Sequence, residues 1–212
     1  PHVAGESCPF DHVRPEVVRD GLYTHLEQSC KMVINQRHEA SKRQLADELR
    51  KVLPASAIST EVGLDVNGRV VPRSYKSGQR VIGDVHVELK DAYRDQWFLD
   101  VGWRSVGGAA SVSRALSSVE VIFQDKRRSF EAIAARGGHI KFLPVAISTS
   151  GLVHELSKQS PVTKQLPNAA WRRIVAVGLL KQAESAVEML RLMERRACAR
   201  GPPPAAAGRG GR

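Results

Sequence analysis

The first strong pattern of apolar and polar positions along the chain is helical. In residues 36–52, Leu45, Leu49 and Val52 recur at intervals of three and four, which places them on one face of a helix. Pro54 follows, and a proline cannot continue a helix because it lacks the backbone N–H and clashes with the preceding turn. We therefore expect one amphipathic helix that ends close to residue 52.

Alternating apolar and polar residues then predict a series of strands. Residues 58–66 and 69–71 flank an Asn-Gly dipeptide, which is typical of the tight turn of a hairpin. The next two apolar-rich runs, residues 81–89 and 97–103, are joined by a short polar segment. They predict a second antiparallel pair of strands.

The rest of the chain is expected to be mainly helical, with one further strand. The pattern predicts a long helix at residues 113–135, a strand at 140–148, and helical segments from about residue 153 that break near Pro161 and Pro167. An order of helix, strands, helix, strand and helices favours an α/β fold in which helices flank a mixed sheet.

The charge of the chain indicates an anionic partner. The formal net charge is +10 and the isoelectric point is near 10, values typical of proteins that bind nucleic acid or an acidic membrane surface. No run approaches the roughly 20 apolar residues that span a bilayer, and the N-terminus has no signal-peptide pattern. We expect a soluble intracellular protein with no membrane partner. Because residue 1 is Pro rather than Met, we also expect a fragment of a longer reading frame or a processed product.

Two aspartates are predicted to face each other across the second pair of strands. Strict alternation in residues 81–89 places Asp84 and His86 on the face opposite the valines of that strand. If the hairpin pairs symmetrically about Ala92, Asp84 and Asp100 are opposite each other, with β-carbons about 5 Å apart. Such a pair can bind one Mg²⁺ or Mn²⁺ ion, and phosphodiester hydrolysis uses such an ion to activate water and to offset charge on the phosphate.

A lysine in the long helix completes a candidate catalytic group. Lys126 falls within a stripe of apolar residues on that helix, formed by Val119, Ile122, Phe123, Phe130 and Ile133. An inward lysine is costly unless it meets an anion, such as a carboxylate pair or a phosphate. Arg127 and Arg128 point away from the stripe and are expected to bind the DNA backbone. Taken singly, an aspartate on a strand or a lysine beside a stripe is more often structural.

One competing motif lies close to the first aspartate. Glu88 and Lys90 form a literal E-x-K motif after Asp84. However, Glu88 lies four residues along the same strand, roughly 13 Å from Asp84 at 3.3 Å per residue, which is too far for a shared metal ion. Asp100 is therefore the preferred second carboxylate. Glu61, on an earlier strand, is a candidate for a third acidic residue.

The N-terminal region has a pattern of metal-binding residue types. Cys8, His12, His25 and Cys30 form C-x3-H-x12-H-x4-C, two close pairs joined by a loop, which suits tetrahedral Zn²⁺. The alternative is that Cys8 and His12 are unrelated to the second pair and that His25 packs in the core. An odd number of cysteines favours metal binding or free thiols over disulfides.

These residues resemble the restriction-like endonuclease of non-LTR retrotransposons, in which a PD-(D/E)XK nuclease follows the reverse transcriptase. The resemblance covers roughly residues 8–190. The similar motifs, in chain order, are Ser29-Cys30, Arg37-His38-Glu39, Glu61, Gly83-Asp84-Val85, Phe98-Leu99-Asp100-Val101, Lys126 with Phe130, Phe142-Leu143-Pro144, Thr149 and Gly151. The chain departs from the family pattern at Gly83, where the motif has proline, at Phe130, where tyrosine is more familiar, and at Ser129, where another basic residue is expected.

The resemblance implies a PD-(D/E)XK fold and a nuclease that nicks target DNA to prime reverse transcription. It implies metal binding by Asp84 and Asp100, a catalytic role for Lys126, and a zinc knuckle that ends at Cys30. The expected partner is DNA, with RNA as an alternative, and the location is nuclear if the parent is a eukaryotic retroelement. The alternative function is a nucleic-acid-binding module that has lost nuclease activity.

Two residues at the start of the first helix are further candidates for the site. Arg37 and His38 are assigned to nucleic-acid binding, although His38 could instead orient a nearby carboxylate or phosphate. The expected division of the chain is a zinc-knuckle-like element at 1–35, a restriction-like endonuclease core at 36–152, C-terminal helices at 153–198, and a disordered tail rich in Pro, Ala, Gly and Arg at 199–212.

Overall fold

The computed structural model describes residues 31–65, 69–72, 81–90, 95–105, 112–137 and 140–199. Within these ranges the chain alternates between helices and strands in the order that the sequence predicts. The elements are α2 (Lys31–Val52), β1 (Ala57–Leu64), β2 (Val70–Pro72), β3 (Val81–Glu88), β4 (Gln96–Arg104), α3 (Val112–Gly137), β5 (Ile140–Ser148), α4 (Glu155–Gln159) and α5 (Asn168–Ala199).

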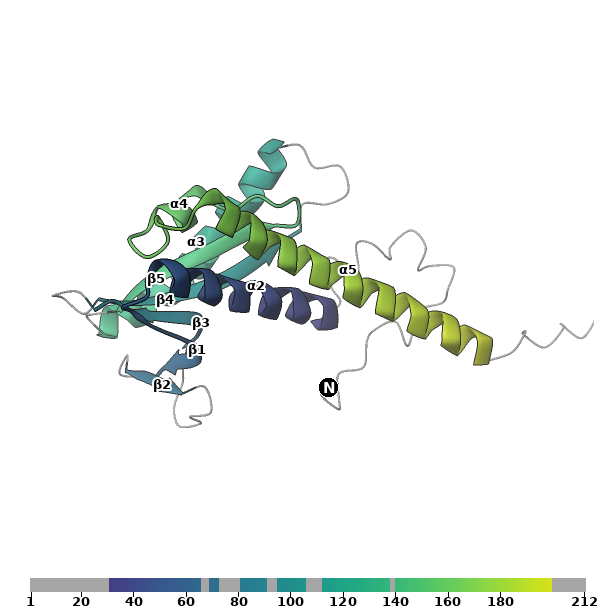
Figure 1. The fold of residues 1–212 in the computed structure, drawn as a ribbon, viewed down its shortest axis with the longest axis horizontal. Coiled ribbons are helices and arrows are strands. Elements are labelled where there is room, and N and C mark those ends of the chain that lie inside the picture. Colours follow the sequence, from purple (N-terminus) through teal and green to yellow (C-terminus); the bar gives the residue numbers. More distant parts are fainter. Residues whose placement is uncertain are drawn as a thin grey trace, which may run out of the picture.

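The strands form one mixed sheet in the order β2-β1-β3-β4-β5. The first four strands in this order pair antiparallel, whereas β4 and β5 are parallel. Parallel neighbours need a long crossover connection, and α3 provides it between β4 and β5. The protein is therefore a mixed α/β structure with an open sheet flanked by helices, which confirms the expected fold class at this level (Figure 1).

Helices α2 and α5 lie side by side over one face of the sheet (Figure 1). Their apolar residues and those of the sheet form the main core, because each element has one apolar face to remove from water. The fully or nearly fully buried members include Leu45 and Leu49 of α2, Val85, Val87, Leu99, Val101, Val145 and Ile147 of the sheet, and Trp171 and Ile174 of α5.

Helix α3 packs against the other face of the sheet. Near its C-terminal end, Phe130 is buried with Phe98 of β4 and stacks on Phe142 of β5, with ring centroids 3.9 Å apart. Nearer its start, Val119 and Phe123 pack against Ala146 of β5. The apolar stripe expected on this helix therefore fixes it to the sheet on both sides of Lys126, while the side chain of the expected stripe residue Ile133 lies outside the described part.

The limits of several elements differ from the sequence-based expectation. Helix α2 begins at Lys31 rather than at residue 36, because Val33 is fully buried and extends the apolar face by one turn. Likewise, α5 is helical through Ala199, the first residue of the expected tail. Residues 1–30 and 200–212 lie outside the described ranges, as does the Asn-Gly turn.

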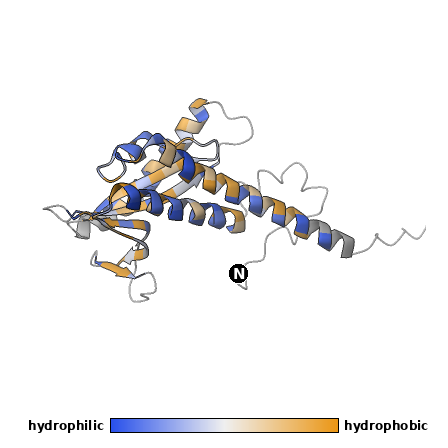
Figure 2. Cartoon of the chain, viewed as in Figure 1, coloured by the Kyte–Doolittle hydropathy of each residue, from blue (hydrophilic) through white to orange (hydrophobic). Residues whose placement is uncertain are grey.

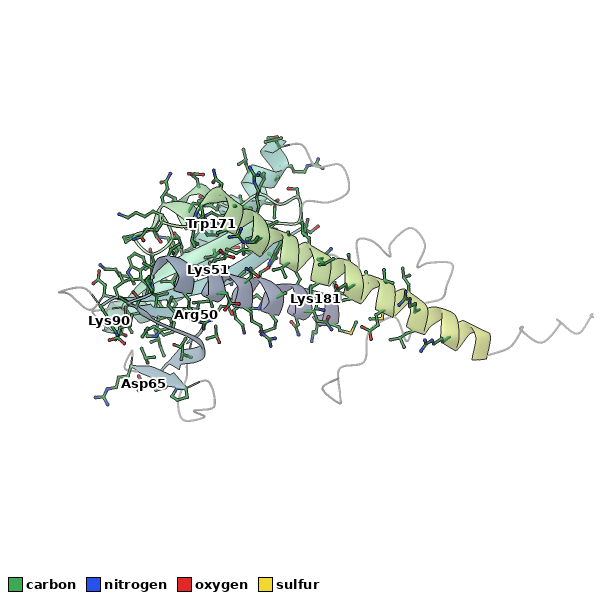
Figure 3. The ribbon with its side chains drawn as sticks, in the orientation of Figure 1. Arg50, Lys51, Asp65, Lys90, Trp171 and Lys181 are labelled. Atoms are coloured by element: carbon green, nitrogen blue, oxygen red, sulfur yellow. The ribbon has the colours of Figure 1, made fainter. Side chains whose placement is uncertain are left out.

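The first turns of α5 belong to the same core as the sheet. Trp171 and Ile174 are buried among sheet residues, and Figure 3 shows Trp171 where α5 crosses the sheet. Farther along, α5 extends past the N-terminal end of α2, and Figure 2 shows hydrophobic and hydrophilic residues alternating along it. In this helix, Leu180, Val187 and Leu190 are exposed.

A glycine and a hydrogen bond fix the contact between α2 and α5. A β-carbon at Gly178 would lie 2.3 Å from Ser41 Oγ and 2.6 Å from a ring carbon of Trp103, so glycine is required for this approach. The Ser41 hydroxyl donates to the backbone carbonyl of Ile174 at 3.1 Å. These contacts hold the middle of α2 at one position along α5.

We expect Gly178→Ala to lower the free energy of unfolding by about 1–3 kcal/mol, because the added methyl group overpacks the contact between α2 and α5. The sign of this change in the free energy of unfolding is informative, since Gly→Ala at an exposed position inside a helix ordinarily stabilises the fold by about 1 kcal/mol. Urea denaturation measures the change. The exposed residue Ala183 of the same helix serves as a reference, where Ala183→Gly should show the ordinary propensity effect. An unchanged or increased stability of Gly178→Ala would contradict the close packing.

The Glu48 carboxylate accepts two hydrogen bonds from Arg173, from Nε at 2.8 Å and from Nη2 at 2.7 Å. The bonds from Arg173, together with those from Lys51 (Figure 3) and Gln44, lower the pKa of Glu48 to about 2. The ionised carboxylate therefore stabilises the fold fully above the ordinary pKa of 4.5, and this contribution is lost as the pH falls toward about 2.

Glu48→Gln is expected to reduce stability by about 1 kcal/mol at pH 7, with the difference from wild type shrinking below about pH 4.5. Thermal unfolding at a series of pH values measures this. Asp47→Asn, which removes an exposed partner of Arg50, is the control and should change little. A difference that is constant between pH 7 and pH 3 would be inconsistent with the lowered pKa.

Candidate functional site

The candidate site lies directly beyond the last paired residues of β3 and β4, Val85 and Leu99. The ladder between these strands includes Val85–Leu99 and Glu88–Gln96, and each pair is symmetrical about residue 92, as expected. In this register Asp84 and Asp100 occupy the next pair of positions. There the backbone N–H of Val101 donates to Asp84 Oδ2 at 2.6 Å, so the Asp84 carboxylate lies between the two strands.

Side chains from both helical layers meet at these aspartates. His38 Nε2 of α2 lies 2.9 Å from Asp84 Oδ2, and Lys126 Nζ of α3 donates to Asp100 Oδ2 at 2.5 Å. The Asp84 and Asp100 carboxyl groups lie close to each other, with one oxygen of each within 4.8 Å. Asp84, Asp100 and Lys126, which the sequence predicts as one group, therefore converge in the structure, and His38 joins them.

The two carboxyl groups have opposite pKa shifts. Burial raises the pKa of Asp100 to about 6; Lys126 opposes this effect, and the negative charge of Asp84 adds to it. Burial also opposes ionisation of Asp84, but the hydrogen bond and charge of His38 and the hydrogen bond from the Val101 amide hold the pKa of Asp84 below its usual range. Asp84 is therefore the more acidic member of the pair and stays ionised at pH values at which Asp100 takes up a proton.

The environment of His38 favours its protonated form. Burial alone lowers the pKa of this imidazole, but the hydrogen bond to Asp84 and the negative charge of that carboxylate outweigh burial and raise the pKa. The side chain is 30% exposed, so it can be reached from solvent. His38 therefore orients a carboxylate of the site, which is one of the two roles that its sequence position suggested.

Two glycines make room for the site. A β-carbon at Gly102 would lie 2.4 Å from Lys126 Cε, so the lysine reaches Asp100 by passing over a position without a side chain. A β-carbon at Gly83 would lie 2.3 Å from a ring atom of Phe98. Gly102 has a role in the site that its sequence pattern did not predict. Its signal in the sequence is a glycine two residues after the second aspartate.

The arrangement can bind a divalent cation. Among the described residues, the only cluster of three potential ligands comprises His38, Asp84 and Asp100, whose ligand atoms all lie within 4.8 Å of one another. Two carboxylate oxygens and one imidazole nitrogen are common ligands of divalent metal ions. Glu88 is not in this cluster, and Figure 3 shows Lys90 at the edge of the sheet where β3 ends.

An open depression of about 260 Å³ lies next to the site. It is lined by Asp100 and Lys126 together with Asp125, Ser129, Phe130 and Phe142. The acidic and basic groups of the site are therefore reachable from the surface on the α3 side. This access is needed for any reaction on a large substrate.

Other predicted site residues lie elsewhere. Arg37 is buried between the layers, donates from Nη1 to Gln182 at 2.6 Å, and lies over the Trp103 ring at 5.1 Å. The guanidinium group of Arg37 therefore lies against α5 and Trp103, and the assignment of Arg37 to nucleic-acid binding stays a prediction. Arg127 and Arg128 are exposed on α3, and Arg127 donates to Glu131.

The remaining candidates are buried or lie outside the described part. His86 is 6% exposed and its ring lies 4.8 Å from that of Phe98, and burial lowers its pKa. Glu61 is on β1, between the pairs Thr60–Val85 and Val62–Gly83, but its side chain is outside the described part. The four candidate zinc ligands, Cys8, His12, His25 and Cys30, are all outside the described residues.

Comparisons with known proteins add no assignment. A scan against models of protein families gives no match, and no curated protein matches the sequence. None of the helices in the described ranges combines the length and apolar character required to cross a bilayer. We therefore infer the function from the chemistry of the site.

Replacing Lys126 by methionine is expected to raise the pKa of Asp100 above about 6, because the ammonium charge favours the ionised carboxylate. Asp84→Asn should have the opposite effect, since it removes a neighbouring negative charge. Carboxyl ¹³C NMR titration of the metal-free protein measures both shifts. Lys141→Met removes a lysine that is paired with Asp95 instead, and is expected to leave Asp100 unchanged. An unaltered Asp100 pKa in Lys126→Met would show that the lysine does not act on this carboxyl group.

Proposed function

We propose that this protein is a metal-dependent DNA endonuclease of the PD-(D/E)XK class, similar to the nuclease of non-LTR retrotransposons that nicks target DNA. The observation that supports this most directly is the convergence of Asp84 on β3, Asp100 on β4 and Lys126 from α3. Two acids on neighbouring strands with one lysine are the group that this chemistry requires.

The position of the lysine supports the proposal further. The motif name places lysine two residues after the second acid, on the same strand, and Gly102 occupies that position here. Lys126 Cε lies in the space that a side chain at position 102 would fill. The ammonium group from α3 therefore takes the place of a strand lysine, and the glycine allows this substitution.

Each side chain has a distinct role in the proposed reaction. Asp84 and Asp100 hold a divalent cation such as Mg²⁺ or Mn²⁺, for which their oxygens are suitable ligands. When bound, such an ion lowers the pKa of a coordinated water and offsets charge on the phosphate. Lys126 orients the attacking water or stabilises the negative charge of the transition state. The depression beside Asp100 and Lys126 gives a phosphodiester access to these groups.

The charge of the protein is consistent with a nucleic-acid substrate. The net charge is +10, and Arg127 and Arg128 are exposed on the helix that bears Lys126. Exposed arginines of this kind bind phosphates without reading sequence. The same charge also suits a module that binds nucleic acid without cleaving it, so cleavage and binding must be measured separately.

The test is nicking of supercoiled plasmid DNA with Mg²⁺ or Mn²⁺ and with EDTA. We expect wild-type protein to nick only with metal, and Asp84→Asn, Asp100→Asn and Lys126→Met to reduce the rate by about 100-fold or more, as for loss of a group that acts on the transition state. Matched controls are Lys141→Met and Asp95→Asn, which disrupt a lysine–aspartate pair outside the site and should retain activity.

Nicking that survives Asp100→Asn or EDTA would refute the proposed mechanism. Salt-sensitive DNA binding without nicking, retained by Asp84→Asn and Asp100→Asn, would instead indicate a binding module on a nuclease fold. Neither binding nor nicking at low salt would exclude both functions.

A further inference from the structure

We propose that His38 is the third protein ligand of the metal site, and that the site therefore selects a divalent transition-metal ion such as Mn²⁺ over Mg²⁺. The inference rests on the proposed function, which assigns Asp84 and Asp100 as metal ligands. It adds a ligand from a third element, α2. It also adds a preference for a transition-metal ion over Mg²⁺, which two carboxylates alone do not give.

The spacing of the ligand atoms supports a shared ion. His38 Nε2 and Asp84 Oδ2 are 2.9 Å apart. Neighbouring ligands about 2.1 Å from an octahedral ion are separated by about 3 Å, so these two atoms already have the spacing of adjacent ligands. Asp100 contributes the third atom, with all three within 4.8 Å. Opposite ligands are about 4.2 Å apart, so only a small contraction is needed.

The position of His38 is fixed by the residues around it. Arg37 is held against Trp103 and donates to Gln182 of α5, and one turn later Ser41 bonds to the Ile174 carbonyl. His38 therefore approaches Asp84 from a turn of α2 that is anchored on both sides. A ligand that is held in place before binding loses little conformational entropy when the ion binds.

The other ring nitrogen has a carboxylate nearby. His38 Nδ1 lies 3.9 Å from Glu39 Oε1. Histidines that bind a metal ion commonly donate their second N–H to a carboxylate, a carbonyl or water, which fixes the tautomer and the ring orientation. Glu39 Oε1 also accepts a hydrogen bond from Lys42 Nζ at 2.6 Å, so this lysine holds the Glu39 charge beside Nδ1. Binding of an ion would replace the hydrogen bond that His38 Nε2 now makes to Asp84 Oδ2, with loss of the Nε2 proton, while the Nδ1–H stays beside the Glu39 carboxylate.

The ligand chemistry determines the metal preference. Mg²⁺ is a hard ion that is bound mainly by oxygen atoms and water, whereas imidazole nitrogen favours first-row transition ions. One nitrogen and two carboxylate oxygens therefore stabilise a transition ion more than they stabilise Mg²⁺. An aspartate at position 38 would give an oxygen-only site and remove the preference.

The experiment compares metal binding by wild-type protein, His38→Asp and a control variant, independently of nuclease activity. His154→Asn is the control, because His154 also pairs with a carboxylate, Glu120 at 2.6 Å, but is not in the metal-ligand cluster. We expect isothermal titration calorimetry to show wild type binding Mn²⁺ at least about 10-fold more tightly than Mg²⁺. The ratio should fall toward unity in His38→Asp and stay unchanged in His154→Asn.

Pulsed electron paramagnetic resonance of bound Mn²⁺ gives a direct test of the ligand. We expect coupling to an imidazole ¹⁴N nucleus in wild type and in His154→Asn, and none in His38→Asp. Coupling that persists in His38→Asp, bound Mn²⁺ without nitrogen coupling in wild type, or no Mn²⁺ binding at all would each overturn the inference.

The nicking assay separates this result from the proposed function. If His38→Asp still nicks plasmid DNA with Mg²⁺ and wild type shows no nitrogen coupling, the endonuclease stands and the histidine ligand is wrong. If wild type binds Mn²⁺ with nitrogen coupling but nicks no DNA, the metal centre stands and the endonuclease function is wrong.

Discussion

The Asp84 carboxylate is the interaction on which the rest of the site depends. It lies between two strands and accepts hydrogen bonds from the Val101 amide and from His38. These donors stabilise its charge in a buried position, where an unpaired carboxylate would be costly. Burial raises the pKa of Asp100, and the negative charge of ionised Asp84 beside it adds to this effect. The two neighbouring carboxyl groups therefore differ in pKa, which is lowered for Asp84 and raised for Asp100.

The helices make this arrangement possible from opposite sides of the sheet. The α2–α5 pair shares the main core and fixes the turn that bears His38. On the other face, Phe130 anchors α3 between Phe98 and Phe142, next to Lys126. His38 and Lys126 are therefore each carried by a helix that is held by apolar packing. This packing fixes the positions of their charged groups relative to the two aspartates.

Such a site reduces the stability of the fold. Like charges at Asp84 and Asp100, and a lysine with only 23% of its side chain exposed, cost free energy that neutral residues would not. The glycine at position 102 leaves out side-chain contacts so that Lys126 can approach Asp100. These costs are consistent with the proposed site for a cation and an anionic substrate.

The sequence by itself determined the order of the elements and the faces on which Asp84, Asp100 and Lys126 lie, because periodicity depends on neighbouring residues alone. It predicted the register of β3 and β4 on the assumption that the hairpin is symmetrical about Ala92, and the observed pairs fit that assumption. Only the tertiary structure decided that His38 reaches Asp84, that Arg37 is buried against α5, and that Gly102 makes room for Lys126. Those contacts join residues far apart in the chain, and their geometry depends on how whole helices pack on the sheet, which no local pattern specifies.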